Sequence, residues 1–152
     1  RQAAPMSARR TLAPIGWREW IGLPDLCPTP IKAKVDTGAR TSSLHAFDLR
    51  LLGTGDAAEV EFEIHPHPRA AHDAVAVRVP VIGFRKVRPS TGHAELRPVI
   101  RTTLRVGEHR YPIDVTLTSR DAMGFRMLIG RSALRRHFLV DSGRSFLQGD
   151  PA

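Results

Sequence analysis

Apolar and polar residues alternate with a period of two in several short runs of the chain. The runs lie at 31–35, 60–64, 75–79, 99–106 and 111–117. Residues two apart on a strand share one face of a sheet, so this pattern predicts strands with one buried side. Long runs with the 3.6-residue period of an amphipathic helix do not occur. The pattern therefore predicts an all-β protein.

Turn-forming residues separate these runs, at 53–56, 66–68, 90–92 and 107–108. Many short strands at close spacing are typical of a closed barrel or a sandwich. One short helix is predicted at 131–137, directly after Gly130 and with Ser132 near its start. Residues 1–13 are predicted to form a disordered basic arm, and residues 14–150 a single domain.

Length and cysteine content narrow the class of protein. A chain of 152 residues is long enough to bury a core as one domain. Its single cysteine, Cys27, excludes an internal disulfide and fits a reducing compartment. No apolar run approaches the ~18 residues of a membrane span, and the first residues lack the apolar segment of a secretory signal. We therefore expect a cytoplasmic protein without a membrane partner.

The charge of the chain is uneven. The formal net charge is +8, and residues 78–110 hold eight Lys or Arg residues against only Glu95 and Glu108. Such an excess favours an anionic partner, although a merely solvated basic face is the alternative. Nucleic acid is possible but not favoured, because Phe84 and Tyr111 are the only aromatic residues near this stretch available for base stacking.

One strand-to-turn segment carries candidate chemistry. The predicted strand at 31–35 ends at Asp36, which is followed by Thr37 and Gly38. Glycine permits the tight turn, and the threonine hydroxyl can bond to a partner loop. These are common turn residues, so an ordinary Asx turn is the alternative. Far downstream, an apolar strand ends in Gly130-Arg131, ahead of the predicted helix.

These two segments together carry a specific resemblance. The runs K-A-K-V-D-T-G-A-R-T-S-S-L-H-A and T-L-T-S-R-D-A-M-G-F-R-M-L-I-G-R resemble those of the bacterial retropepsin-like aspartic peptidases. This family is often labelled putative ATP-dependent zinc protease and is associated with the RimK glutamate-ligase system. The resemblance covers roughly residues 14–147. It implies a retropepsin-like closed β-barrel of a single lobe with one short C-terminal helix, and a catalytic Asp36 supported by Thr37 and Gly38.

Aspartic peptidase chemistry needs two carboxylates that share a proton. With one Asp-Thr-Gly-Ala run per chain, the resemblance implies that a homodimer completes the active site. Asp141 lies in a similar Asp-Ser-Gly run, but only nine residues follow Gly143, too few for a second lobe. We therefore expect a structural turn at Asp141, and we expect residues 138–147 to pair at the dimer interface.

The resemblance also implies a flap that closes over substrate. Our candidate is the segment 87–94, and an ordinary surface hairpin is the alternative. The residues expected to bind substrate come from the flap, the catalytic strand and loop, and the Gly-Arg motif: Arg88, Ser90, Thr91, Gly92, Lys34, Ala39, Arg40 and Arg131.

Two of these residues depart from the retroviral pattern. Lys34 shares a strand face with Asp36, where retroviral enzymes have an apolar residue. Arg40 stands where they have an acidic residue that pairs with the arginine of the Gly-Arg motif. Together with the cations that flank the flap (Arg85, Lys86, Arg88 and Arg97), they predict a positively charged cleft.

A positively charged cleft suits a carboxylate-rich peptide. We therefore expect an aspartic peptidase that cleaves glutamate-rich peptide, such as poly-glutamate tails of a ribosomal protein, with a functional link to a RimK-like glutamate ligase. A catalytically silent module that holds an acidic partner in the same groove is the alternative.

The sequence offers little support for a metal or a nucleotide. It lacks the H-E-x-x-H motif, and Gly53-Thr54-Gly55 lacks the Lys-Ser/Thr context of a phosphate-binding loop. His65, His67 and His72 form the best histidine cluster, and exposed loop histidines are the simpler interpretation. We therefore expect no metal and no cofactor, with a zinc-dependent peptidase as a further alternative.

Overall fold

The computed structural model describes residues 11–67, 73–88, 92–120 and 124–149. The first part of the chain forms β1 (Ala13–Gly16), β2 (Arg18–Leu23), β3 (Cys27–Val35), β4 (Ser42–His45), β5 (Phe47–Leu52), the 3-10 turn η1 (Gly55–Ala57), β6 (Glu59–Ile64) and β7 (Val75–Pro80). The second part forms β8 (Gly83–Val87), β9 (Glu95–Val106), β10 (His109–Thr118), β11 (Met127–Ile129), α2 (Arg131–Leu134) and β12 (Phe138–Asp141).

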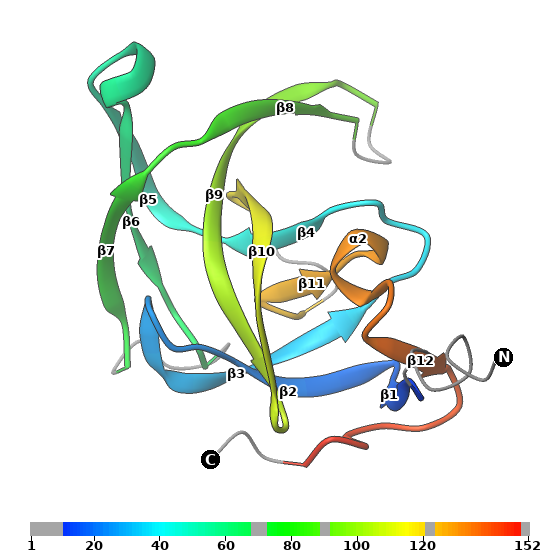
Figure 1. The fold of residues 1–152 in the computed structure, drawn as a ribbon. Helices are drawn as coiled ribbons and strands as arrows, with labels where there is room; N and C mark the ends of the chain where they lie inside the picture. Colours follow the sequence, from blue (N-terminus) through cyan, green and yellow to red (C-terminus); the bar gives the residue numbers. More distant parts are fainter. Residues whose placement is uncertain (1–10, 68–72, 89–91, 121–123, 150–152) are drawn as a thin grey trace, which may run out of the picture.

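Six strands close into a barrel (Figure 1). Their order is β10-β4-β11-β3-β2-β9, and the ring closes because β9 also pairs with β10 in an antiparallel register from Val99↔Thr116 to Val106↔His109. Closure leaves these strands without free edges in the barrel wall. The predicted all-β barrel with one short helix after Gly130 is confirmed.

The barrel interior follows the period-two pattern of the sequence. On β3, Ile31, Ala33 and Val35 are buried, whereas Lys32 and Lys34 between them are half-buried. On β11, Met127 and Ile129 are fully buried in the same core. Each strand therefore has one core face and one outer face, and the polar side chains between the core residues lie on the outer face.

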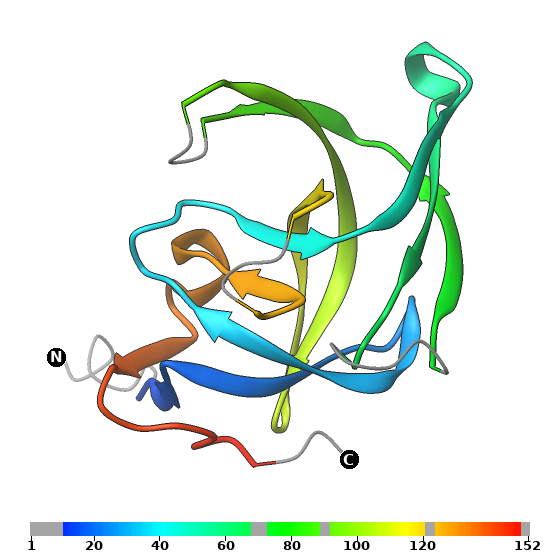
Figure 2. The same ribbon diagram turned by 180° about the vertical axis from the view of Figure 1, so that it is seen from behind.

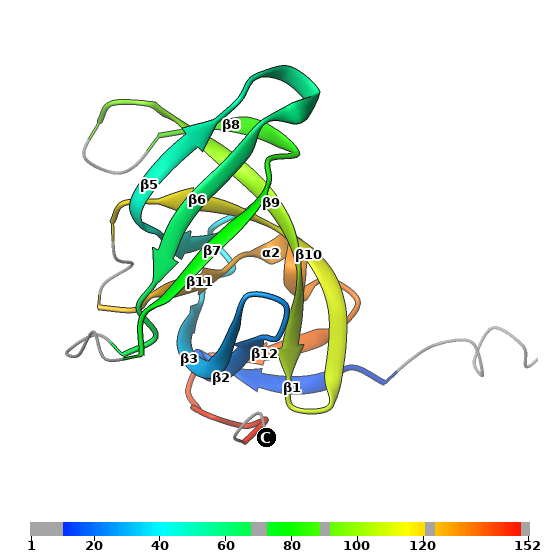
Figure 3. The ribbon, with the colours of Figure 1, turned by 90° about the vertical axis from the view of Figure 1, so that its left-hand side faces the viewer.

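A second sheet of three antiparallel strands, β5-β6-β7, stands beside the barrel (Figure 3). Its buried side chains, among them Phe62 and Ile64, belong to the same core cluster as the barrel residues. The strands predicted at 60–64 and 75–79 are therefore β6 and β7, and one continuous core joins the two sheets.

The two ends of the described chain meet in a small parallel sheet, with Ala13↔Phe138 through Gly16↔Asp141 on β1 and β12. Segment 138–147, expected at a dimer interface, thus has a strand partner within its own chain. The fully buried carboxylate of Glu19 fixes this arrangement, because it accepts hydrogen bonds from the backbone N–H groups of Gly16 at 2.6 Å, Leu147 at 2.8 Å and Gln148 at 3.1 Å. Buried carboxylates need such partners, and no motif in the sequence indicates that Glu19 has this role.

The predicted helix is shorter than expected. It ends at Leu134 instead of residue 137, and Arg136 has a φ of 68° in the left-handed region, which cannot continue a right-handed helix. β3 begins at Cys27, earlier than the predicted 31, so the strand includes Pro28 and Pro30. Among the described residues, we find no helix with the length and apolar character needed to cross a membrane.

Candidate active site

Asp36 stands at the end of β3, where this strand leaves the barrel. The preceding residues pair in parallel with β11, in the register Lys34↔Leu128 and Val35↔Ile129. The N–H of Asp36 donates to the carbonyl of Ile129 at 2.9 Å, and its Oδ1 accepts from the N–H of Gly38 at 2.9 Å. Hydrogen bonds therefore fix both the backbone and the carboxylate of Asp36, and the side chain is half-buried.

Gly130 lets β11 approach the loop that follows Asp36. A Cβ at this position would lie 2.5 Å from the carbonyl carbon and oxygen of Thr41, far inside van der Waals contact. The N–H of Gly130 also donates to Ser42 Oγ at 3.1 Å, inside the core. Any larger residue would force the backbone of Thr41 to shift, which explains why a glycine follows the apolar strand.

The start of α2 holds the loop from the other side. The N–H groups of Arg131 and Ser132 donate to the carbonyls of Ala39 at 2.7 Å and Arg40 at 3.0 Å. The guanidinium of Arg131 donates through Nη1 to the carbonyl of Thr37 at 2.9 Å. Arg131, expected to bind substrate, therefore supports the backbone of the loop with at least one of its N–H groups.

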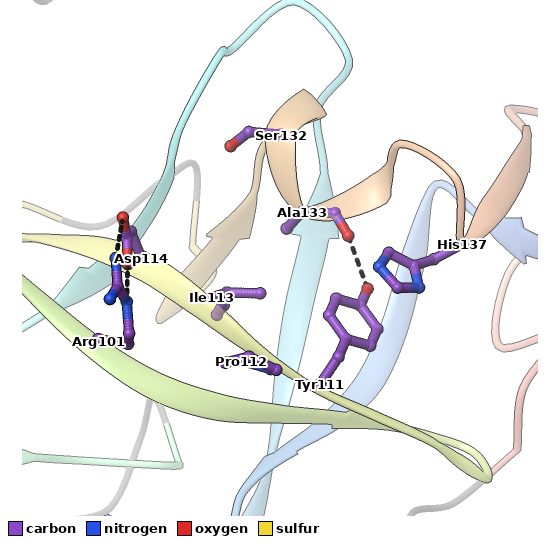
Figure 4. A pocket seen from close by; sticks show the side chains of 8 residues that line it. All are labelled: Arg101, Tyr111, Pro112, Ile113, Asp114, Ser132, Ala133 and His137. Carbon is purple, nitrogen blue, oxygen red and sulfur yellow. Dashed lines mark hydrogen bonds and ion pairs between the residues drawn. The ribbon is translucent and has the colours of Figure 1, made fainter.

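Tyr111 ties α2 to the barrel (Figure 4). Its hydroxyl donates to the carbonyl of Ala133 at 2.7 Å, and its ring stacks on His137 with centroids 3.7 Å apart. Burial raises the pKa of Tyr111, so the hydroxyl stays protonated and remains a donor. Tyr111 thereby positions the helix that holds the Asp36 loop.

The same region contains a hollow of about 410 Å³ between α2, β9 and β10. Its walls include Ile113, Ser132 and an exposed ion pair in which Arg101 Nε lies 2.8 Å from Asp114 Oδ1 (Figure 4). The neighbouring carboxylate raises the pKa of Arg101. Asp36 does not line this hollow, so the hollow and the candidate active site are separate features.

Three half-buried side chains form a row on the face of the barrel wall that carries Asp36. Lys34 on β3 is opposite Leu128 on β11, which is opposite Ser43 on β4. Residues opposite one another on neighbouring strands share a face, and Lys34 shares that face with Asp36 two residues later. We call this row the floor. The sequence indicated Lys34 but neither Leu128 nor Ser43, because non-local strand pairing brings them there.

The exposed part of the loop carries unneutralised positive charge. Thr37, Gly38 and Arg40 are exposed, and Ala39 is half-buried. Within the ranges that the structure describes, no carboxylate pairs with the guanidinium of Arg40 or of Arg131. The structure thus places Lys34 on β3, Arg40 in the loop that follows Asp36, and Arg131 at the start of the helix that holds this loop.

The candidate flap is the hairpin of β8 and β9. These strands pair from Gly83↔Val99 to Val87↔Glu95, and in Figures 1 and 2 the hairpin extends out above β4 and β11. Arg88 and Gly92 are exposed at its end, whereas Ser90 and Thr91 lie outside the described residues. The hairpin predicted around 87–94 is therefore present, and its closure over a substrate stays a prediction.

The remaining candidates lie elsewhere. Asp141 ends β12, outside the barrel, and its Oδ1 accepts from the N–H of Gly143 at 3.2 Å, as in an Asx turn. His65 pairs with Glu63 at 2.9 Å and His67 with Asp73 at 2.6 Å, while His72 lies outside the described residues. In the described part of the chain, no three His, Cys, Asp or Glu residues are grouped so that they could hold a metal ion.

Comparison with known proteins gives consistent matches. The family described as RimB-like, retropepsin-like aspartic endopeptidase RimB, matches residues 14–151. Proteins named probable alpha-L-glutamate ligase from Parasynechococcus marenigrum and Shewanella halifaxensis are 45% and 41% identical over 90% and 89% of this chain. The chain spans only 29% and 30% of the lengths of these relatives.

The fold also matches a solved structure, that of the Legionella pneumophila protein Lpg0085 of unknown function. The TM-score is 0.73 and the sequence identity 25%, and the match covers 91% of this chain and 99% of the other. The similarity therefore extends over the barrel and the small sheets together.

Proposed function

Because the chain belongs to the family of RimB-like, retropepsin-like aspartic endopeptidases, we propose that it hydrolyses peptide bonds with Asp36 as its catalytic carboxylate. One observation supports Asp36 as the catalytic residue. Hydrogen bonds to Ile129 and Gly38 hold Asp36 at the end of a buried strand, while the turn around it is open to solvent. A preorganised carboxylate beside an accessible turn is what water activation requires.

The reaction needs a second carboxylate, and we propose that Asp36 of a second copy supplies it. Two carboxylates at close range share one proton, because both cannot ionise easily. The ionised carboxylate takes a proton from water, and the hydroxyl oxygen forms a bond to the carbonyl carbon of the peptide. The protonated carboxylate donates its proton to the carbonyl oxygen, which gives a tetrahedral diol. Proton transfer to the amide nitrogen then lets the C–N bond break.

The exposure of Thr37 and Gly38 supports this pairing of two copies. In a single chain these residues make the open end of the turn, and the Thr37 hydroxyl is available to a partner loop. An isologous contact around a twofold axis would bring each turn against its equivalent and place the two Asp36 carboxylates together. The active site is therefore incomplete without the second copy.

We propose that the substrate is an acidic, glutamate-rich peptide. Lys34 shares a face with Asp36, and Arg40 and Arg131 have no carboxylate partner among the described residues. Ala39 in the loop and Arg88, Ser90, Thr91 and Gly92 of the hairpin complete the proposed binding surface. Ammonium and guanidinium groups bind carboxylates by charge and by paired hydrogen bonds.

The relatives support the same choice of substrate. Proteins that contain a segment similar to this chain are named probable alpha-L-glutamate ligases. A peptidase that removes glutamate would reverse the addition that such a ligase makes. A glutamate tail on a ribosomal protein is the substrate that we propose, with a functional link to the ligase.

The test is incubation with a peptide that ends in a poly-α-glutamate tail, with its products read by mass spectrometry. We expect the wild type to shorten the tail and the Asp36→Asn variant to leave it intact. Asp141→Asn is the matched control, because Asp141 has a similar turn outside the barrel, and it should cleave like the wild type.

Other outcomes separate the remaining possibilities. Binding of the tail by the wild type without cleavage would identify a silent binding module. Loss of activity with a chelator and recovery with zinc would favour a metal-dependent reaction, and cleavage at the wild-type rate by Asp36→Asn would exclude the proposed mechanism.

A further inference from the structure

The β8–β9 hairpin has two chemically different faces, and the strand register identifies them. On β9 the side chains of Ile100 and Leu104 point into the barrel and are fully buried. The pairing of β9 with both β10 and β8 is regular, with no shift from Val106 to Glu95. Since alternation is preserved along a regular strand, Pro98 and Leu96 continue the face of Ile100.

This face leaves the barrel at Pro98 and becomes open to solvent, with Leu96 66% exposed. The cross-strand partners on the same face are Phe84, opposite Pro98, and Lys86, opposite Leu96. Phe84 is 47% exposed, so the face is mainly apolar and carries one ammonium group. We call this face of the hairpin the roof.

The opposite face of the hairpin holds Arg85 and Arg97, which are also cross-strand partners. The side chain of Arg97 is only 12% exposed and bonds Glu95 at 2.6 Å. Of the four cations that flank the predicted flap, Arg85 and Arg97 therefore lie on the face away from the roof. The expectation that all four line one cleft is corrected by this alternation.

The floor repeats the combination found on the roof. Lys34 is opposite Leu128 on the floor, as Lys86 is opposite Leu96 on the roof. Neighbouring strands lie about 4.8 Å apart, so each surface places an ammonium group directly beside an apolar side chain. A peptide of glutamates alone would bring carboxylates to the ammonium groups, but it would also place a carboxylate against each leucine, where the carboxylate loses water without gaining a partner.

The apolar surface continues beyond the roof. Phe84 also lines a groove of about 830 Å³ together with Leu51 and Ile82, which are 52% and 47% exposed. The groove shares Phe84 with the roof, so a substrate peptide that lies under the roof can extend into it.

We infer that this peptidase selects a peptide in which an apolar residue adjoins acidic residues, with Lys34 and Lys86 binding the acidic side chains and Leu96, Leu128 and Phe84 binding the apolar one. The inference rests on the proposed peptidase function and sharpens its substrate class. It predicts cleavage at a fixed distance from the apolar residue, such as the junction between an acidic tail and the protein that bears it.

The experiment compares an all-glutamate peptide with a series in which one leucine replaces glutamate at each successive position, with products read by mass spectrometry. We expect kcat/KM for the preferred leucine position to exceed that of the all-glutamate peptide by about tenfold. The cut should move with the leucine. The variant Leu96→Ser should reduce this preference to about twofold or less, whereas Leu49→Ser should keep it.

Leu49 is a matched control because it is also an exposed leucine on a strand, 36% exposed, but lies on β5, outside the roof and the floor. Cleavage that depends on Asp36 but is indifferent to leucine would overturn this inference and leave the proposed function standing. Absence of Asp36-dependent cleavage of every peptide would overturn both. Circular dichroism of each variant verifies that the barrel is folded.

Discussion

Replacing Gly130 by alanine tests whether the close contact between β11 and the Asp36 loop is essential to the site. The new Cβ would meet the backbone of Thr41 at 2.5 Å, and backbone cannot move aside as the end of a side chain can. Overpacking of this kind costs about 1–3 kcal/mol. Loss of the Gly130 N–H bond to Ser42 Oγ adds about 1 kcal/mol, because both groups are buried.

The free energy of unfolding should therefore fall by about 2–4 kcal/mol, which urea denaturation measures. Peptidase activity should fall further than the unfolded fraction explains, because displacement of β11 moves the carbonyl of Ile129 that holds Asp36. Activity is measured without urea and at a temperature well below the midpoint of unfolding, so that the wild type and the Gly130→Ala variant are both folded.

Gly143→Ala is the matched control. A Cβ at Gly143 would have its nearest neighbour, Asp141 Oδ1, at an ordinary distance of 3.7 Å, so stability should change by about 0.5 kcal/mol or less. The reasoning would be refuted if Gly130→Ala were as stable and as active as Gly143→Ala, since the contact with Thr41 would then be easily relieved.

Three further variants test other parts of the account. Glu19→Ala should lower the free energy of unfolding by about 3 kcal/mol in urea, because three backbone N–H groups lose a charged acceptor, whereas the exposed Glu108→Ala should change it by about 0.5 kcal/mol or less. Tyr111→Phe should lower it by about 1 kcal/mol at neutral pH. Wild-type stability should also fall as pH rises above about 10, where the unfolded chain loses the tyrosine proton that the folded chain keeps, and this decline should be smaller in Tyr111→Phe, measured by urea denaturation across pH. Lys34→Met should lower kcat/KM for an acidic peptide by about tenfold and weaken its dependence on salt in steady-state assays, and an unchanged salt dependence would contradict its proposed role.

The barrel was predictable from sequence because alternation is a local signal. Strands such as β6 and β10 show it within a few residues, and the turn residues between them mark their ends. Prolines hide the signal at the start of β3, and β4 and β11 are too short to show a period. The helix was predicted too long because no residue type near its end indicates the left-handed conformation of Arg136.

The candidate site was only partly predictable. Asp36 and the Gly130-Arg131 pair stand out as motifs, and Lys34 follows from alternation. Ser42, Ser43 and Leu128 do not, because they reach the site through strand pairing between residues far apart in sequence. The faces of the hairpin likewise follow only from the register of β8 and β9, which puts Arg85 and Arg97 on the face opposite to that of Lys86.

The proposal that two chains share one active site is tested most directly by mixing subunits. Wild type and the Asp36→Asn variant are unfolded together at equal concentration, refolded as a mixture, and assayed on the glutamate-tailed peptide at the same total concentration as wild type alone. If each active site needs Asp36 from both copies, random pairing leaves about one quarter of the wild-type activity. Activity of about one half would contradict the account, because it would mean that each chain works with its own carboxylate.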